Sequence, residues 1–95
     1  MRILLIEDDK MVGESLLHAL KADGYAVDWV RDGERGEENL RTSVYALVLL
    51  DLGLPKRSGL DLLKNLRKRD DKVPVLILSA RDQIKDRVDG LDLGA

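Results

Sequence analysis

Acidic residues that follow two separate apolar runs are the residues of this sequence best suited to chemistry. Glu7 and Asp8 come directly after the run 3–6, and Asp51 comes directly after the run 46–50. Short continuous apolar runs are typical of parallel strands covered on both faces. In open α/β sheets, ligands and chemistry collect at the carboxyl edge of the strands. If the two strands are neighbours, we expect the three carboxylates to converge there.

Converging carboxylates repel one another, and either protonation or a bound cation must relieve that repulsion. Mg²⁺ fits, because it takes one or two carboxylates and keeps waters and phosphate oxygens in its shell. The same cation would neutralise charge on a phosphoryl group brought to Asp51, whose carboxylate can act as a nucleophile. Ser79 follows a further apolar run and adds a hydroxyl to the same edge.

Strand and helix patterns alternate along the chain and would position these groups. We expect strands over 3–6, 26–30, 46–50 and 74–78, and helices over 10–23, 32–41, 58–69 and from 82 onward. This alternation with short connections predicts right-handed βαβ units and a parallel sheet with helices on both faces. The helix over 32–41 has the weakest apolar pattern, because Gly36, Glu37 and Glu38 occupy its interior and Leu40 is its only large apolar residue.

Particular residues of these elements have predicted local roles. The first helix should bury a stripe with i, i+4, i+7, i+8 spacing, formed by Val12, Leu16, Ala19 and Leu20. Asp9, Asp32 and Ser58 are expected N-caps, and Gly24 is an expected helix stop. His18 is expected on the surface, and Trp29 is interpreted as packing of an edge strand rather than as a ligand platform.

Length and composition limit the classes of function. The 95 residues form one small domain, with 44% hydrophobic and 36% charged residues and a net charge of −2. The acidic balance argues against direct nucleic-acid binding. The absence of cysteine excludes disulfides and thiolate metal sites and is compatible with the cytoplasm. No apolar run approaches the ~20 residues of a membrane span, and no signal peptide is expected.

The sequence contains three motifs in order: Ile6-Glu7-Asp8-Asp9, Asp51-Leu52-Gly53-Leu54-Pro55 with Gly59, and Leu78-Ser79-Ala80-Arg81-Asp82. These motifs resemble those of the receiver domain of bacterial two-component response regulators, and the resemblance covers all 95 residues. The sequence is similar to the OmpR/PhoB-like subfamily with a winged-helix output domain, and within it to the PmrA/QseB-type branch. The resemblance implies a flavodoxin-like (CheY-like) doubly wound sheet of order 2-1-3-4. This strand order follows from the resemblance to the fold and not from the residue pattern.

The resemblance also implies roles for individual residues. Asp51 would be the phosphoacceptor, and Ser79 would be the switch hydroxyl that bonds the phosphoryl oxygen. Asp8 would bind Mg²⁺ directly, Glu7 would act directly or through water, and Gly53 would offer its backbone carbonyl. The partner would be a sensor histidine kinase, and DNA would be reached only through a winged-helix domain outside this chain. The domain would accept a phosphoryl group and assist its own phosphorylation and dephosphorylation rather than act as an enzyme.

The family continues with a fifth strand and a fifth helix, and we expect this chain to end before both. The family lysine that bonds the phosphoryl group lies in that continuation, so phosphorylation of this chain alone is expected to be slow or absent. The strand over 75–78 would then be an apolar sheet edge, and such edges favour pairing with another chain. We therefore expect either self-association through this edge and the first helix or a loss of stability.

Other functions compete with the receiver hypothesis. A phosphatase of the haloacid-dehalogenase type also uses a nucleophilic aspartate and magnesium, but it requires an acid where Gly53 stands. A flavin-binding flavodoxin would need a phosphate-binding loop after the first strand, where three acids would repel phosphate. A non-signalling fragment of a receiver is the remaining alternative.

Overall fold

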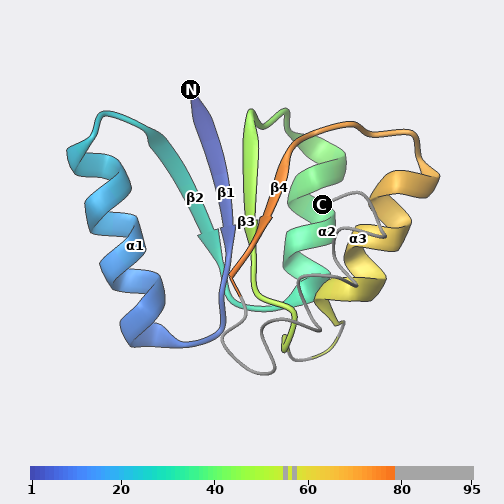
Figure 1. Ribbon diagram of the computed structural model, residues 1–95, viewed down its shortest axis with the longest axis horizontal. Helices are drawn as coiled ribbons and strands as arrows, with labels where there is room; N and C mark the ends of the chain where they lie inside the picture. The colour runs from blue at the N-terminus through green and yellow to red at the C-terminus, as the bar shows by residue number, and fades with distance from the viewer. Residues whose placement is uncertain (55, 57, 79–95) are drawn as a thin grey trace.

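A computed structural model of the chain describes residues 1–54, 56 and 58–78. Four strands and three helices alternate in these residues (Figure 1). The elements are β1 (Arg2–Ile6), α1 (Lys10–Ala22), β2 (Ala26–Val30), α2 (Gly33–Thr42), β3 (Leu47–Leu50), α3 (Gly59–Lys68) and β4 (Val75–Ile77). The helix expected from residue 82 lies outside the described residues.

The four strands form one parallel sheet of order β2-β1-β3-β4, which confirms the predicted fold class and strand order. In the register of the sheet, Ile6 pairs with both Val30 and Leu50, and Leu50 pairs with Ile77. The strands therefore end level with one another, and the residues that follow them meet at one edge (Figure 1).

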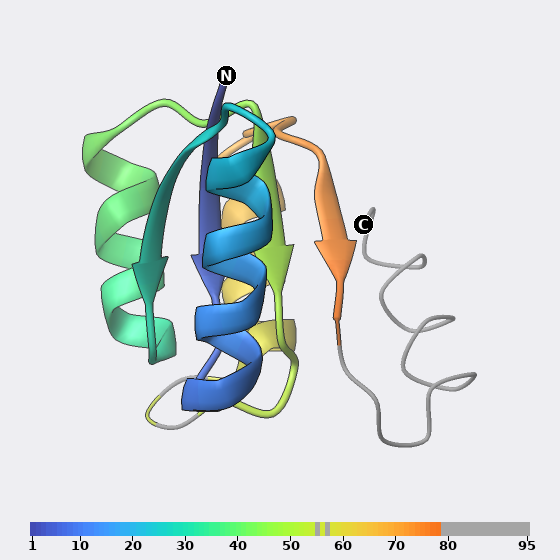
Figure 2. The ribbon, with the colours of Figure 1, turned by 90° about the vertical axis from the view of Figure 1, so that its left-hand side faces the viewer.

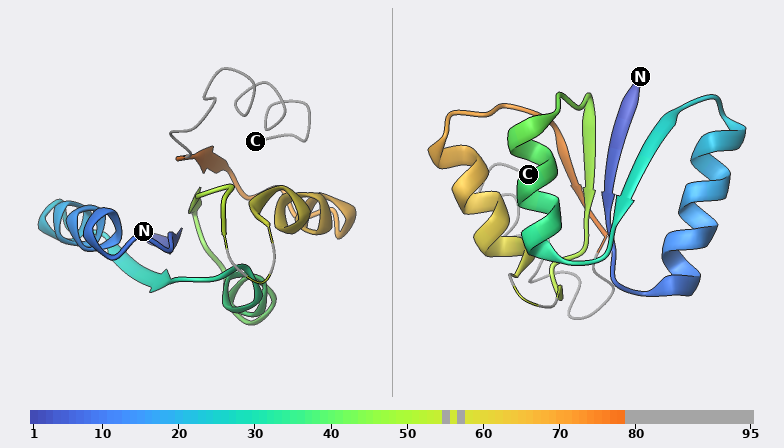
Figure 3. Two further views of the ribbon diagram at one scale, coloured as in Figure 1. Left: turned by 90° about the horizontal axis from the view of Figure 1, so that it is seen from below. Right: turned by 180° about the vertical axis from the view of Figure 1, so that it is seen from behind.

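Alternation of side chains along the strands divides the core between the two faces. On one face, Leu4, Ile6, Val48 and Leu50 pack with side chains of α2 and α3, including the fully buried Leu63. On the other face, Ile3, Leu5 and Leu49 pack with α1 and with the partly buried residues of β2. Figure 2 and Figure 3 show α1 on one side of the sheet and α2 with α3 on the other.

The buried stripe of α1 differs from the sequence prediction. Val12 is 44% exposed and Ala19 is also exposed, whereas Gly13 is buried and Leu16 and Leu20 pack on the sheet. The helix is rotated toward Gly13 because the ring of Trp29 lies against it: a Cβ on this glycine would lie 2.1 Å from Trp29 Cζ2. The bulk of one side chain on β2 thus overrides the apolar periodicity of α1. His18 is exposed, as predicted.

The helix α2 forms over ten residues, which confirms the predicted helix over 32–41. The glycine in the interior of α2 allows the helix to pack closely and does not interrupt it. Gly36 is buried, and a Cβ on it would lie 2.7 Å from Ile6 Cδ1, so the missing side chain lets the helix approach β1 closely. Leu40, one turn further on, is buried in the same core cluster.

All three expected N-caps are confirmed. The side chains of Asp9, Asp32 and Ser58 each accept a hydrogen bond from the backbone N–H three residues later, at the starts of α1, α2 and α3. Gly24 follows α1 with a φ of 91°, in the left-handed region that glycine tolerates. Within the described part of the chain, no helix has the length and apolar character that crossing a bilayer requires.

Candidate functional site

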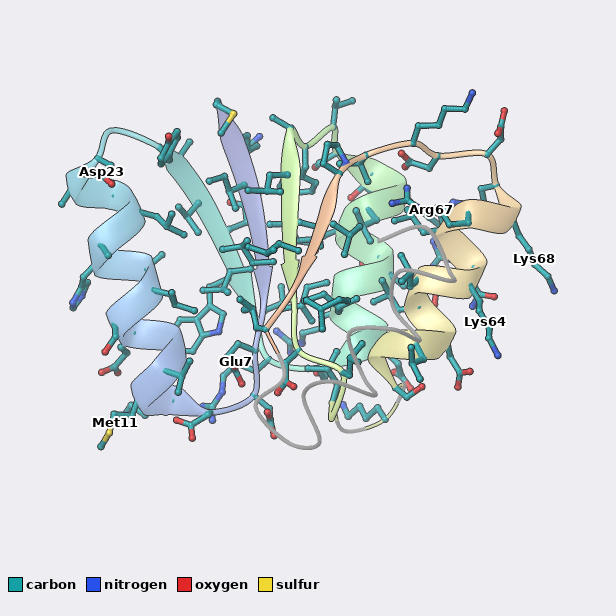
Figure 4. The ribbon with its side chains drawn as sticks, viewed as in Figure 1. Glu7, Met11, Asp23, Lys64, Arg67 and Lys68 are labelled. Carbon is teal, nitrogen blue, oxygen red and sulfur yellow. The ribbon has the colours of Figure 1, made fainter. Side chains whose placement is uncertain are left out.

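The carboxyl edge of the sheet brings together the three acids that the sequence singles out. Glu7 and Asp8 follow β1, and Asp51 follows β3, directly after the paired residues Ile6 and Leu50. Each of the three acids offers a carboxylate oxygen, and these oxygens all lie within 4.8 Å of one another. Figure 4 shows Glu7 at the lower end of β1, where the strands end. The predicted convergence of these carboxylates is therefore present in the structure.

Glu7 is the most buried member of this acidic cluster, with only 6% of its surface exposed. Burial raises its pKa to about 7, and the neighbouring carboxylates of Asp51 and Asp8 also raise it. The backbone N–H of Asp9 donates to Glu7 Oε2 at 3.1 Å and partly offsets that rise. The cluster thus holds more negative charge than its surroundings stabilise, which is the condition that a bound cation relieves.

Asp51 is oriented by backbone groups on both sides of it. Its N–H donates to the carbonyl of Ile6 at 3.0 Å, which ties the residue to the end of β1. Its Oδ1 accepts a 3.1 Å hydrogen bond from the N–H of Gly53. Asp51 as a whole is only partly buried.

The loop between β3 and α3 is attached to its neighbours at two further points. The N–H of Gly59 donates to the carbonyl of Leu52 at 3.0 Å, which closes the loop on itself. Lys56 adopts a φ of 67°, and its Nζ lies 3.9 Å from Asp32 Oδ2, at the N-cap of α2. The amino-terminal ends of α2 and α3 therefore both contact the loop that carries Asp51.

The residues present fit a magnesium site. Mg²⁺ prefers hard oxygen ligands and binds through one or two carboxylates while keeping several waters, and the acidic cluster supplies three such side chains. Gly53 lies beside Asp51, and only its N–H has a described role there. Ser79 lies outside the described residues, so its predicted place at this edge stays a prediction.

Two side chains that the sequence did not mark also contact this site. Trp29 Nε1 donates to the carbonyl of Glu7, and Arg31 Nη2 donates to the carbonyl of Asp8. The available signal was positional: both residues lie near the carboxyl end of the strand expected beside β1. It was too weak to separate them from ordinary edge-strand packing, which Trp29 also provides in the core cluster under α1.

A cavity of about 340 Å³ lies at the other edge of the sheet, between the end of α2 and the residues before β4. Leu40, Tyr45 and Val73 are among its lining residues. The acidic cluster takes no part in it. The site around Asp51 is thus a surface constellation of acids rather than part of this cavity.

Comparison with known proteins places the chain in a family. Residues 3–95 match the family "Response regulator receiver domain". The chain is 52% identical over 95 residues to the response regulator protein PmrA of Pseudomonas aeruginosa and 47% identical to the transcriptional regulatory protein QseB of Escherichia coli O157:H7. Both matches cover 100% of this chain and 43% of the relative, so the chain spans less than half the length of these proteins.

A solved structure gives a second comparison, of the fold. The response regulator TrrA from Thermotoga maritima, in complex with Mg²⁺ and BeF, superposes with a TM-score of 0.85 at 28% identity. That match covers 95% of this chain and 78% of the TrrA chain. The α/β fold of the chain agrees with these matches, and the acidic cluster is consistent with the magnesium site of a receiver domain. The chain belongs to the response regulator receiver domains, and it is similar to those of the PmrA and QseB regulators.

Proposed function

We propose that residues 1–95 form a phosphoacceptor receiver of a two-component response regulator, and that Asp51 is the residue phosphorylated. The observation that carries the proposal is the meeting of Glu7, Asp8 and Asp51 within 4.8 Å at the carboxyl edge of the sheet. Membership of the receiver family supports it, because phosphoacceptor signalling is what the family implies. A sensor histidine kinase is the proposed donor.

The transfer forms one bond and breaks one bond. An oxygen of the Asp51 carboxylate attacks the phosphorus of a phosphohistidine on the kinase, and a new O–P bond forms as the P–N bond breaks. The electron pair of the P–N bond goes to the imidazole nitrogen, which can then take a proton. The N–H of Gly53, on Asp51 Oδ1, holds the carboxylate in one orientation for this attack.

Asp8, Glu7 and Asp51 are the proposed side-chain ligands of Mg²⁺, and the Gly53 carbonyl is a proposed backbone ligand. When bound, the ion supplies positive charge at the oxygens of the transferred group. Ser79 is proposed as the hydroxyl that responds to the phosphoryl group. In the whole regulator, a winged-helix output domain would contact DNA, and the protein would work in the cytoplasm.

The family match disfavours the phosphatase alternative, and so does a feature of the loop. Haloacid-dehalogenase phosphatases require a second acid two residues after the nucleophile, and Gly53 occupies that position. A glycine has no group that could protonate a leaving alcohol. The remaining alternative, a non-signalling fragment, concerns the 95-residue chain alone, and a phosphorylation assay in which only an extended chain is labelled would favour it.

The assay measures the intact mass of the chain after incubation with acetyl phosphate and Mg²⁺. It uses this chain and a version extended at its carboxyl end with sequence from a receiver of the family, which supplies the family lysine. We expect one added phosphoryl group on the extended chain, slower or no labelling of the 95-residue chain, and loss of labelling with EDTA. Asp51→Asn should abolish labelling, because an amide is a far poorer nucleophile. An unlabelled extended chain, or a labelled Asp51→Asn variant, would contradict the proposal.

A further inference from the structure

Two side chains at the carboxyl end of β2, Trp29 within the strand and Arg31 directly after it, hold the backbone of the loop that carries the proposed metal ligands. Trp29 Nε1 donates a 2.9 Å hydrogen bond to the carbonyl oxygen of Glu7. Arg31 Nη2 donates a 2.8 Å hydrogen bond to the carbonyl oxygen of Asp8. The peptide group that follows each of these two acids is therefore fixed by a partner that lies more than twenty residues away along the chain.

These two hydrogen bonds follow directly after the backbone hydrogen bonds that pair β1 with β2. The N–H of Glu7 still donates to the carbonyl of Val30 at 3.1 Å, in continuation of the pairing of β1 with β2. Beyond that point the backbone turns into α1, which starts after the N-cap Asp9. Trp29 and Arg31 thus extend the attachment of β1 to β2 by two peptide groups, across the residues whose carboxylates must be placed.

The indole that makes the first bond is itself held in place. The ring lies against the backbone of α1 at Gly13, where even a methyl group would overlap it, with 2.1 Å between the added carbon and Trp29 Cζ2. The guanidinium carbon of Arg31 lies 5.9 Å from the centroid of the same ring. At that distance the cation is attracted by the face of the ring, which links the two donors to each other.

We propose that Trp29 and Arg31 are positioning residues of the magnesium site. They would hold the Glu7–Asp8 backbone so that both carboxylates face Asp51 before the ion arrives. Mg²⁺ demands near-octahedral geometry, so placing its ligands in advance lowers the cost of binding, as groups that orient metal ligands commonly do. This inference rests on the proposed function, because it assumes that the acidic cluster binds the ion.

The test measures Mg²⁺ affinity by titration, with the backbone amide NMR signals of Asp51 and Gly53 as reporters, and measures stability separately by urea unfolding without Mg²⁺. Trp29→Phe keeps an aromatic ring against Gly13 and removes the N–H donor. Arg31→Lys keeps the positive charge, so the electrostatic effect on the ion is unchanged, and it removes the planar guanidinium. Val27→Ala is the matched control, because Val27 packs on the same face of β2 and contacts neither carbonyl.

We expect Trp29→Phe to weaken Mg²⁺ binding about three- to tenfold, in keeping with the loss of one partly buried hydrogen bond. Arg31→Lys should weaken it about twofold, because the hydrogen bond of Arg31 is exposed to solvent. Val27→Ala should lower stability and leave Mg²⁺ affinity at the wild-type value. Unchanged affinity in both variants, or an equal loss in Val27→Ala, would overturn the positioning role alone. A wild-type chain that binds no Mg²⁺ would overturn the proposed metal site, and this inference with it.

Discussion

The backbone of Gly59 lies against the carbonyl oxygen of Asp51 so closely that an added Cβ would lie 2.5 Å from it. The same Cβ would lie 2.7 Å from the α-carbon of Leu52. Both neighbours are backbone atoms, which cannot move aside as the end of a side chain can. The first turn of α3 thus packs directly on the residue proposed as phosphoacceptor, and only glycine leaves room for this contact.

Gly59→Ala should therefore lower the free energy of unfolding by about 1–3 kcal/mol, the usual cost of forcing extra volume into a packed site. Alanine is the better helix former, so helix propensity alone would predict the opposite sign. Urea unfolding of the variant and the wild type measures the difference. Lys64→Ala, on the exposed face of α3, is the control and should change stability by less than about 0.5 kcal/mol. A Gly59→Ala variant as stable as the wild type would show that the loop yields easily.

The raised pKa of Glu7 predicts a pH dependence of stability in the absence of Mg²⁺. Its pKa rises from an ordinary value of 4.5 to about 7 in the folded chain. The folded state therefore holds this proton more tightly than the unfolded state between those two pH values, and the contribution of Glu7 to stability falls as pH rises through that range. Urea unfolding at pH 5 and pH 8 measures the fall. Glu7→Gln should show a smaller fall than the wild type, and equal falls would contradict the prediction.

The same titration should make Mg²⁺ binding depend on pH. An ion that binds the ionised Glu7 carboxylate must displace its proton, so the apparent affinity should be about tenfold lower at pH 6 than at pH 8. Calorimetric titration in two buffers of different ionisation enthalpy would detect the released proton. Glu7→Gln should bind Mg²⁺ more weakly overall and with little dependence on pH over this range. A wild-type affinity that does not change between pH 6 and pH 8 would rule out competition at Glu7.

Leu76 provides a test of the predicted self-association. Within residues 1–54, 56 and 58–78, β4 pairs only with β3, and Leu76 on it is 56% exposed. If β4 pairs with another chain, Leu76→Lys should shift the sedimentation profile toward monomer, because charged side chains discourage edge pairing. Val44→Lys, at an even more exposed apolar residue outside the strands, is the control and should leave the profile unchanged. A wild-type chain that sediments as a monomer at all concentrations and is as stable as the carboxyl-extended chain would refute the prediction of self-association or lost stability.

The sequence was sufficient for the parts of the fold that depend on local pattern. The apolar runs ending at Ile6 and Leu50 identify buried strands, because few other short segments contain so many branched side chains without a polar residue. The acids after them could be assigned to one edge because parallel strands end together. The order of the strands came from the family resemblance, since periodicity alone does not say which strands are neighbours.

The sequence was insufficient where one element fits against another. Gly36 looked like a helix breaker, and only its distance to Ile6 shows that it allows close packing. In the same way, Val12 matched the apolar stripe of α1, but the ring of Trp29 turns Gly13 inward instead. Such contacts depend on the three-dimensional meeting of residues from different elements, and no single-sequence pattern encodes them.

The central claim is that Asp51 itself accepts the phosphoryl group, and trapping the product tests it most directly. The carboxyl-extended chain is incubated with acetyl phosphate and Mg²⁺ and then treated with borohydride, which reduces an aspartyl phosphate to homoserine. Peptide sequencing by mass spectrometry then locates the reduced residue. We predict homoserine at position 51 and unmodified aspartate at Asp8. Homoserine at any other aspartate, with Asp51 intact, would contradict this account.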